Sequence, residues 1–412
     1  MKKLILLFAF VFLFNQISVS QTWVQKLPGI GMWSLVKDIQ GRIFAGSSGT
    51  IKGVFRTSNG GDTWDTAFIG GASNILYLAC DSSNRVYATY GANGLLKSTN
   101  SGNNWITIPD SVFGNKTVQA VACGKNGYVY VGTVSGYLSR STDNGLTFPD
   151  TALSGLTIVT ITIDRFNPNI VYVGASSTSP SNTGFYRSTD AGLTFSQNLN
   201  PLNIWAIVEK NNHNLYTVTT STGYAFSKST DGGLTWTTVS SLSGAMRGAC
   251  LDLLENIYTS GNGGVFKSTN DGVSFTNAGL TISADQSLSY QNRILVATSG
   301  TSNGGVWIYV DSTISGITNS NTASPDKFLL FQNYPNPFNP GTNIRYQIIN
   351  NSYITLKIFD ILGKEIAALV NEKQNAGIYN IEWDAENYSS GIYFYKLTAD
   401  GFTDIKKMVL LK

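Results

Sequence analysis

An eight-residue pattern occurs six times in this chain of 412 residues and limits the folds that the chain can adopt. The most regular copy, S-T-D-G-G-L-T-W, occupies residues 229–236, and the others begin at Thr57, Ser98, Ser141, Ser188 and Ser268. Successive copies start between 39 and 47 residues apart. A period of this length is typical of one supersecondary unit stacked on itself. The sequence therefore predicts an architecture of similar, stacked units.

The pattern has the chemistry of a tight turn between two strands. Its third residue is Asp or Asn, whose side chain accepts hydrogen bonds from nearby backbone N–H groups. Its fifth residue is Gly, which adopts positive φ without strain, and its eighth is Trp or Phe, which buries a large ring. Asn replaces Asp in half of the copies, so an acceptor is needed and a charge is not. We therefore interpret the third residues as structural, and not as metal ligands or catalytic acids: Asn59, Asn100, Asp143, Asp190, Asp231 and Asn270.

These copies resemble the Asp-box, or BNR, repeat of sialidases, sortilin-like receptors and related β-propellers. In that family the boxes lie at the rim, between the two outer strands of a blade and away from the ligand face. The resemblance implies an all-β propeller. It does not by itself imply sialidase activity, and the F-R-I-P signature of sialidases is missing.

Each repeat has the pattern of four short strands. In the second repeat these are residues 75–80, 85–89, 95–98 and 105–108, where β-branched and aromatic residues are bounded by Gly and Asn. A seventh unit at residues 287–310 has three such strands but no box.

The missing strand of this last unit has a candidate at the other end of the domain. Residues 21–27 contain the T-W pair and the short strand that end a repeat. We expect this N-terminal strand to pair with the last unit. The result would be a seven-bladed β-propeller whose sheet edges are short and protected.

The N-terminus has the features of a secretory signal. Lys2 and Lys3 precede an apolar core at residues 4–14, which is too short to span a bilayer. Small residues before the expected cleavage site, between Ser20 and Gln21, complete the pattern. We expect this segment to direct the chain out of the cytoplasm.

The composition changes near the C-terminus. Residues 311–325 are rich in Ser, Thr and Asn, as in a linker, and residues 326–412 have no box. The expected strands of this last segment, at residues 342–348, 353–360, 377–383, 391–398 and 403–411, suggest a small Ig-like β-sandwich. We therefore divide the chain into a signal peptide (1–20), a propeller (21–310), a linker (311–325) and a C-terminal domain (326–412).

Four motifs identify the C-terminal domain by resemblance. They are Q-N-Y-P-N-P-F-N-P at residues 332–340, I-F-D-I-L-G at 358–363, S-G-I-Y-F at 390–394 and K-K-M-V-L at 406–410. This set is similar to the type A C-terminal sorting domain of the type IX secretion system of Bacteroidota. The resemblance implies recognition by the type IX translocon, removal by its C-terminal signal peptidase, and release or attachment at the outer-membrane surface. An ordinary adhesive Ig-like module is the alternative.

The charge distribution and the absence of known motifs predict no nucleic-acid partner, no metal site and no cofactor. The net charge of +3 is not gathered in a basic stripe. No HExxH, paired CxxC or P-loop occurs, and we interpret His213, the only His, as solvated surface in a polar turn. Three Cys, at positions 80, 123 and 250, occupy equivalent places on inner strands. We expect small buried side chains there, with a Cys80–Cys123 bridge as the alternative.

Ligand binding is expected on the loop face opposite the boxes, because loops on a rigid frame commonly carry function. Tyr90, Tyr137, Trp205 and Tyr224 are suited to stack on sugar rings or peptide side chains. The alternative is that these rings fill blade interiors.

Catalysis is the second hypothesis for this face. Glycoside hydrolysis needs two carboxylates at a defined spacing. We expect Asp110, Asp285 and Glu209 near the opposite loops, but nothing in the sequence pairs them.

Three functions remain to be compared. The leading prediction is a secreted or surface-attached, non-catalytic monomer that binds a glycan, peptide or matrix component and has no assigned catalytic residue. The second is a hydrolase of the sialidase or xyloglucanase type. An assembly factor like the propellers that help to build photosystem II ranks last, because its habitat conflicts with a type IX tail.

Overall fold

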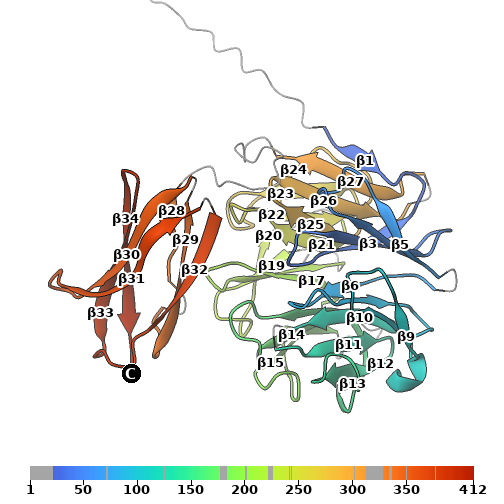
Figure 1. The fold of residues 1–412 in the computed structure, drawn as a ribbon. Coiled ribbons are helices and arrows are strands. Elements are labelled where there is room, and N and C mark those ends of the chain that lie inside the picture. Colours follow the sequence, from blue (N-terminus) through green and yellow to red (C-terminus); the bar gives the residue numbers. More distant parts are fainter. Residues whose placement is uncertain are drawn as a thin grey trace, which may run out of the picture. The chain divides into compact units, whose positions relative to one another are not determined.

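The structure, a computed structural model, describes residues 22–412 apart from 71–72, 125, 177–182, 200–201, 221–225, 241, 243, 301, 312–327, 334–335, 349 and 376. The chain divides into two units between Val310 and Asp311. Strands form the regular structure of both units, and the described residues add one short 3-10 helix at Asp110–Phe113 (Figure 1). The protein is therefore all-β. The expected signal peptide and its cleavage site at Ser20 and Gln21 lie outside the described residues.

The N-terminal unit consists of antiparallel sheets whose strands mostly follow one another along the chain. Two sheets come first: β2 (Met32–Lys37), β3 (Ile43–Ser47), β4 (Gly53–Thr57) and β5 (Asp65–Ile69), then β6 (Leu78–Cys80), β7 (Val86–Thr89), β8 (Leu95–Ser98) and β9 (Ile106–Ile108). A seven-stranded sheet follows: β10 (Val118–Cys123), β11 (Val129–Thr133), β12 (Gly136–Ser141), β13 (Asp150–Ile163), β14 (Val171–Ser176), β15 (Gly184–Ser188) and β16 (Ser196–Leu199).

Three more sheets complete the unit. Two of them are again sequential: β17 (Ile204–Glu209), β18 (Leu215–Thr219), β19 (Phe226–Ser229) and β20 (Thr237–Ser240), then β21 (Met246–Leu251), β22 (Ile257–Gly261), β23 (Gly264–Ser268) and β24 (Thr276–Asn277). The last joins the two ends of the unit: β25 (Ser287–Tyr290), β26 (Arg293–Thr298), β27 (Gly305–Val310) and β1 (Val24–Lys26).

The seven-stranded sheet is two repeats joined by one long strand. The first part of β13 pairs with β12, as in Arg140 opposite Asp150, and its last part pairs with β14, as in Ile163 opposite Val171. Between these parts Gly155 has a φ of 80°. The strand therefore serves as the last strand of one repeat and the first strand of the next.

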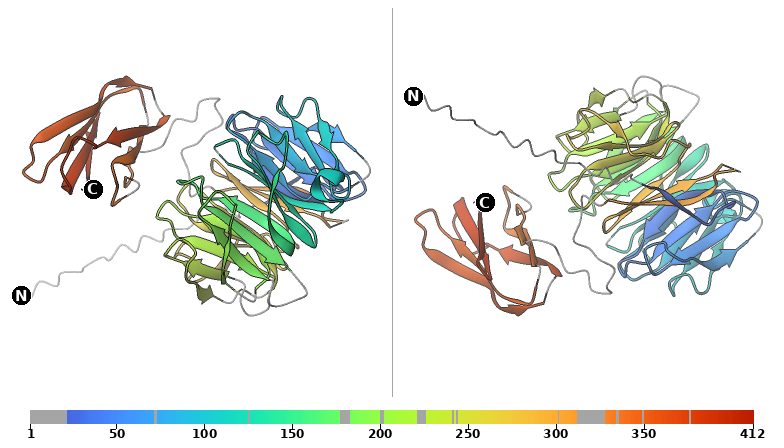
Figure 2. Two further views of the ribbon diagram at one scale, coloured as in Figure 1. Left: turned by 90° about the horizontal axis from the view of Figure 1, so that it is seen from below. Right: turned by 90° about the horizontal axis from the view of Figure 1, so that it is seen from above.

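The N-terminal unit closes into a ring. The first strand of each repeat contacts the first strand of the next, in the order β2, β6, β10, β13, β17, β21, β25 and back to β2. Figure 2 shows the blue first sheet beside the orange strands of the last one. β1 pairs with β27, with Val24 opposite Ile308, and Trp23 Nε1 donates to the Ala278 carbonyl at 2.7 Å. The pairing expected for the N-terminal strand is therefore present.

Large rings on the second strands fill the space between neighbouring sheets. The strands β7, β11, β14, β18 and β22 each place one fully buried tyrosine at their second residue: Tyr87, Tyr130, Tyr172, Tyr216 and Tyr258. Burying an aromatic ring removes a large apolar area from water. These second strands are buried because both faces of each sheet are covered by neighbouring sheets.

Each eight-residue box is held by hydrogen bonds from its first and third side chains. In one copy, Ser229 Oγ donates to Asp231 Oδ1 at 2.7 Å and accepts from the Gly233 N–H at 2.8 Å. Asp231 Oδ1 also accepts from the Thr235 N–H at 2.9 Å. The same three bonds occur in the other five copies. The acceptor required of the third residue is therefore used identically in all six boxes.

A hydroxyl group explains why both Asp and Asn serve at the third position. Thr235 Oγ1 donates to Asp231 Oδ2 at 2.5 Å. In two of the Asn copies the direction reverses: Asn59 Nδ2 donates to Thr63 Oγ1 at 2.9 Å, and Asn270 Nδ2 donates to Ser274 Oγ at 2.9 Å. The third copy has Asn104 at the seventh position and no hydroxyl there. A hydroxyl both donates and accepts, so a carboxylate and an amide fit the same place.

Each box also contacts the sheet that precedes it in the ring. A basic side chain of the preceding sheet reaches the fourth residue of the box. This residue has positive φ in every copy: Gly60, Ser101, Asn144, Ala191, Gly232 and Asp271. Examples are Arg56 Nη1 to the Ser101 carbonyl (2.7 Å) and Arg187 Nε to the Gly232 carbonyl (2.9 Å).

The first box shows the same contact across the two ends of the unit. Arg293, on β26 of the last sheet, donates through Nη1 to the Gly60 carbonyl at 3.1 Å and to Asp62 at 2.8 Å. The boxes therefore connect neighbouring sheets around the whole ring, including the place where its ends meet.

The C-terminal unit has two antiparallel sheets around one core. The sheets are β28 (Leu329–Leu330), β29 (Gly341–Ile348) and β32 (Gly377–Asp384), and β31 (Glu365–Gln374), β30 (Ser352–Phe359), β33 (Gly391–Ala399) and β34 (Phe402–Leu410). Ile344, Leu356, Trp383 and Tyr395 belong to the shared core. Side chains of β30 alternate between buried and more exposed, as expected for a strand with one face in a core.

The Pro-rich segment of the sorting motif is attached to this core. The Asn333 N–H donates to the Tyr395 hydroxyl at 2.6 Å, and Asn333 Nδ2 donates to Thr342 Oγ1 at 2.9 Å. Asn336 Oδ1 accepts from the Val409 N–H at 2.8 Å, and Phe338 is only 2% exposed. These contacts give the motif residues a structural part in the unit.

Strand β31 was not among the strands expected from the sequence. Its residues, E-I-A-A-L-V-N-E-K-Q, include many helix formers. They form a strand because β31 pairs with β30 along its length, from Ser352 opposite Gln374 to Phe359 opposite Glu365. Strand formation depends more on pairing than on intrinsic preference.

Among the residues that the structure describes, no helix has the length or apolar character needed to cross a bilayer.

Two adjacent glycines in one box test the contact between sheets. Gly233 has a φ of 89°, and a Cβ added there would lie 2.8 Å from the Phe185 ring of the preceding sheet. Gly232 has a φ of 70°, but a Cβ there meets nothing within 4 Å. We expect Gly232→Ala to cost about 1–2 kcal/mol for left-handed backbone alone. Gly233→Ala should cost about 1–3 kcal/mol more, because of overpacking.

Chemical denaturation of the two variants, followed by tryptophan fluorescence, measures this difference. Equal losses of stability would show that the box does not pack tightly against the preceding sheet.

Candidate functional site

A pocket of about 150 Å³ lies where the first strands of neighbouring repeats come together. Its wall combines apolar, hydroxyl and amide side chains with one guanidinium, and the lining residues include Thr160, Trp205, Arg247, Gln286 and Ser287. They come from β13, β17, β21 and the start of β25. The pocket is therefore built by the strands closest to the centre of the ring.

The pocket lies on the side away from the boxes. Trp205 and Arg247 are the second residues of β17 and β21. The other end of β17, at Glu209, is followed by Lys210, whose Nζ lies 2.6 Å from Asp271 in a box. Because a strand runs from one side of the ring to the other, the pocket faces the loops that the sequence analysis assigned to ligand binding.

Arg247 is the charged group of this pocket. Its Nη1 pairs with Asp285 Oδ1 at 3.3 Å, and its guanidinium lies 5.8 Å from the centre of the Trp33 ring. Its side chain is 31% exposed, whereas that of Asp285 is 3% exposed. Burial raises the pKa of Asp285, although Ser299 and Arg247 oppose the rise. Arg247 is thus the partner that remains accessible to a ligand.

The four aromatic residues proposed for the ligand face have different positions. Trp205 lines the pocket, and its buried Nε1 has no hydrogen-bond partner among the described residues. Tyr90 is 8% exposed and packs edge-on against Phe68 at 5.7 Å, so it fills the space beside its own sheet. Tyr137 is half-buried on β12, and Tyr224 lies outside the described residues. Only Trp205 is therefore placed at the pocket.

Sequence reasoning did not single out Arg247 or Gln286. A signal was available, because both stand near the start of a first strand at the place that Trp33 and Trp205 occupy in other repeats. Most positions of the repeat hold similar residues in every copy, but this position varies and holds large or polar side chains. A position-by-position comparison of the repeats therefore identifies Arg247 and Gln286.

The expectation for Glu209 was wrong, and that for His213 holds only in part. Glu209 lies at the end of β17 on the box side, and not near the opposite loops. His213 lies in a turn, but its side chain is only 25% exposed, because its Nδ1 lies 3.4 Å from Glu209 Oε1 and its ring centre lies 4.3 Å from that of Phe166. One ligand atom each of Asp164, Glu209 and His213 lie within 4.8 Å of one another. The expectation of no metal site was based on the absence of known sequence motifs, and these three residues form no such motif.

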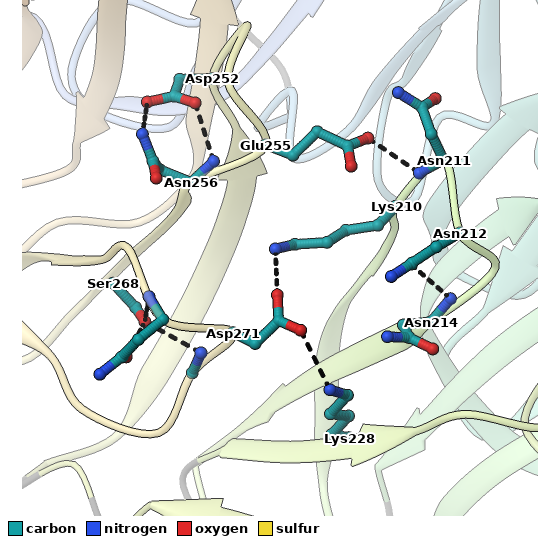
Figure 3. Close-up of polar contacts among 12 residues, drawn as sticks. Lys210, Asn211, Asn212, Asn214, Lys228, Asp252, Glu255, Asn256, Ser268 and Asp271 are labelled. Atoms are coloured by element: carbon teal, nitrogen blue, oxygen red, sulfur yellow. Dashed lines mark hydrogen bonds and ion pairs between the residues drawn. The ribbon is translucent and has the colours of Figure 1, made fainter. Parts of the chain in front are cut away.

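Close to this group, a charged cluster joins two sheets on the box side. Figure 3 shows Asp271 between Lys210 and Lys228, with distances of 2.6 and 3.1 Å. The same view shows Glu255 accepting a hydrogen bond from the Asn211 N–H. The hydrogen bond from Lys210 is the main cause that lowers the pKa of Asp271.

The box carboxylates and the three cysteines are held in places where they contribute to the fold. Hydrogen bonds, first of all from the Thr235 hydroxyl, lower the pKa of Asp231 to about 2. All three cysteines are free, and burial raises the pKa of the Cys80, Cys123 and Cys250 thiols. The alternative of a Cys80–Cys123 bridge is absent from the structure.

The C-terminal unit matches a known family. Residues 332–411 match the model of the Secretion system C-terminal sorting domain. The chain therefore carries a sorting domain at its C-terminal end, and a domain of this kind implies export to the cell surface or beyond it. A comparison with curated protein sequences finds no match.

Solved β-propeller structures share the fold of this chain. PorZ, an essential surface component of the type-IX secretion system of Porphyromonas gingivalis, aligns with a TM-score of 0.55 and 13% identity over 93% of this chain and 60% of PorZ. YCF48 bound to a D1 peptide aligns with a TM-score of 0.55 and 13% identity over 70% of this chain and 96% of YCF48.

A third structure is the extracellular domain of a putative hybrid two component system from B. thetaiotaomicron. It has a TM-score of 0.56 and 14% identity, over 95% of this chain and 57% of that one. This chain spans about three fifths of the length of that protein and of PorZ. Identities this low show a common propeller fold and nothing further.

The ion pairs of Asp271 make stability depend on pH. Since its folded pKa is lowered, its contribution to stability is present above the unfolded pKa of about 3.9 and is lost as the pH falls through the folded value. The Asp271 side chain is 42% exposed, so solvent screens the pairs. We expect Asp271→Asn to cost about 0.5–1 kcal/mol at pH 6 and nearly nothing at pH 2.5.

Urea denaturation at a series of pH values measures this difference. The exposed carboxylate of Asp65, replaced in Asp65→Asn, is the control and should show no such trend. A cost of Asp271→Asn that stays constant down to pH 2.5 would contradict the assignment.

Proposed function

We propose that this chain is an exported propeller that binds an extracellular ligand in the central pocket beside Arg247. The proposed ligand group carries a carboxylate or a similar acceptor, from an acidic peptide or an acidic glycan. The observation that supports the proposal is the partly exposed guanidinium of Arg247, which lies 5.8 Å from the centre of the Trp33 ring in a pocket that Trp205 also lines. Arg presents several N–H donors in a plane that matches a carboxylate.

The size of the pocket sets the scale of the bound group. A volume of about 150 Å³ suits one side chain, one chain terminus or part of one sugar ring. Recognition of a longer ligand then needs the surrounding loops. YCF48, a protein of similar fold, has been solved with a D1 peptide, and this supports a peptide as one ligand class.

A glycan-cleaving hydrolase is the second candidate. Hydrolysis needs a pair of carboxylates across the scissile bond. The described residues that line the pocket carry no carboxylate, and Asp285 is engaged with Arg247 and the Ser299 N–H. This arrangement favours binding over hydrolysis.

The finer architecture is part of the proposal. We assign seven blades, with β13 shared between two of them and β1 completing the last, and an Ig-like topology to the C-terminal unit. The box residues Asn59, Asn100, Asp143, Asp190, Asp231 and Asn270 act in structure and not in binding. The proposed segments are a signal peptide at 1–20, the propeller at 21–310, a linker at 311–325 and the sorting domain at 326–412.

The export route follows from the sorting domain. The signal peptide would direct the chain to the periplasm, and the type IX translocon would then recognise residues 326–412. Its C-terminal signal peptidase would remove the domain, and the monomeric propeller would be released or held at the outer-membrane surface.

Substitution of Arg247 tests the pocket. We expect Arg247→Gln to weaken binding of the full chain to an acidic-peptide array and an acidic-glycan array at least tenfold, because one charge-assisted hydrogen bond is lost. The array that loses signal identifies the ligand class. Lys116→Gln removes an exposed positive charge elsewhere and should change neither array.

A second variant separates binding from stability. Arg247→Gln leaves the buried Asp285 without its partner, whereas the double change with Asp285→Asn removes both charges. Binding that survives in both variants would show that the pocket is not the ligand site.

Removal of the sorting domain tests export. We expect a chain that ends at residue 325 to accumulate in the periplasm of its native bacterium, whereas the full chain reaches the surface or the medium. Fractionation and immunoblotting measure this distribution. Export of the shortened chain at the normal level would contradict the role of residues 326–412.

A further inference from the structure

Three side chains that can bind a metal ion meet at one place on the box side of the ring. Asp164 follows the end of β13, Glu209 ends β17, and His213 lies in the turn after β17. One ligand atom from each lies within 4.8 Å of the others. The sequence separates them by up to 49 positions, so the fold and not a local motif brings them together.

Asp164 lacks the partner that equivalent residues have. Asp38 pairs with Arg42 at 2.6 Å, and Asp81 pairs with Arg85 at 2.5 Å, in each case four residues later. The turn after Asp164 is two residues longer, and the residue whose carbonyl accepts from the Asp164 N–H is Ile170, in the place of Arg42 and Arg85. The side chain of Ile170 has no donor. Asp164 Oδ2 accepts instead from the Tyr172 hydroxyl at 2.7 Å. Asp38 and Asp81 each have an Arg partner, whereas no described Arg pairs with the carboxylate of Asp164.

Glu209 adds a second buried carboxylate. Its side chain is 1% exposed, and its Oε2 accepts from the Arg165 N–H at 2.9 Å. Its Oε1 accepts no hydrogen bond from any described residue and lies 3.4 Å from His213 Nδ1. A buried carboxylate oxygen without a donor is costly unless a cation faces it. Either a protonated His213 or a metal ion held between the two side chains supplies this positive charge.

His213 supplies a nitrogen and a path from solvent. Its φ of 63° places it at the tip of the turn, where the equivalent residues include Asn84 and Glu255, also at positive φ. Its ring rests on Phe166 at 4.3 Å, and its side chain is 25% exposed. An ion can reach the group from this side.

We propose that Asp164, Glu209 and His213 bind one divalent transition-metal ion of the zinc type. One imidazole and two carboxylates are ligands that zinc accepts, and a site with three protein ligands leaves a position for water. The bonds from Tyr172 and from the Arg165 N–H orient the two carboxylates from behind, as outer groups do in metal sites. Tetrahedral zinc–ligand distances of about 2.0–2.2 Å place two ligand atoms about 3.3–3.6 Å apart. The 3.4 Å between Glu209 Oε1 and His213 Nδ1 matches this separation.

Two basic side chains near this site, Lys210 and Arg165, have other partners. Lys210 is directed to Asp271 at 2.6 Å, on the neighbouring sheet. Arg165 donates through Nη1 to the Glu209 main-chain carbonyl at 3.0 Å. These contacts direct both cations elsewhere than Glu209 Oε1.

A zinc titration of the full chain without a polyhistidine tag tests the proposal. We expect one Zn²⁺ per chain by mass spectrometry of bound metal and by competition with a chromogenic chelator. Glu209→Gln and His213→Asn should each weaken binding at least tenfold. Asn tolerates the positive φ of position 213. The matched control is Glu255→Gln, a carboxylate in the next turn, which should leave the affinity unchanged.

The single histidine gives a second measurement that needs no variant. Its imidazole NMR signals belong to one residue, because the chain has one His. Saturating Zn²⁺ should shift them in step with the titration. Absence of saturable binding, binding that both variants retain in full, or histidine signals that Zn²⁺ leaves unchanged would each overturn the proposal.

Discussion

The contact between each box and the sheet before it holds the ring together. Inside the box, the first and third side chains bond to the backbone, as Ser229 and Asp231 do. Toward the neighbour, the fourth residue receives a basic side chain. The fifth residue, a glycine, fits against a ring such as Phe185 in five boxes and against Ile308 and Leu295 in the first. The recurrence of these positions in the sequence is thus explained by two sets of contacts, one within a sheet and one between sheets.

Much of the fold was predictable because these contacts recur. The box marked the turn between the last two strands of six repeats, and the T-W pair near Trp23 marked the strand that completes the last sheet. The C-terminal unit has no internal repeat to compare. There, β31 escaped prediction because its residues favour helix and only its pairing with β30 makes it a strand.

The candidate sites were less predictable, for a geometrical reason. The two ends of a first strand lie on opposite sides of the ring, the pocket side and the box side. An error of a few positions in placing a residue along the strand therefore assigns it to the wrong side. Glu209 was assigned to the wrong side for this reason, whereas Trp205, at the other end of the same strand, lies at the pocket away from the boxes. The environment of His213 depends on Phe166 from another repeat, and sequence spacing contains no signal for that contact.

The boxes leave the first strands free to differ. Because the boxes connect the sheets at the rim, the side chains at both ends of the first strands carry no repeated contact of this kind. One end presents Trp205 and Arg247, and the other presents Glu209 beside His213. These residues depart from the frame where the ring does not require a particular residue. A repeat protein can therefore place two unrelated sites on opposite sides of one scaffold, and a change at one need not disturb the other.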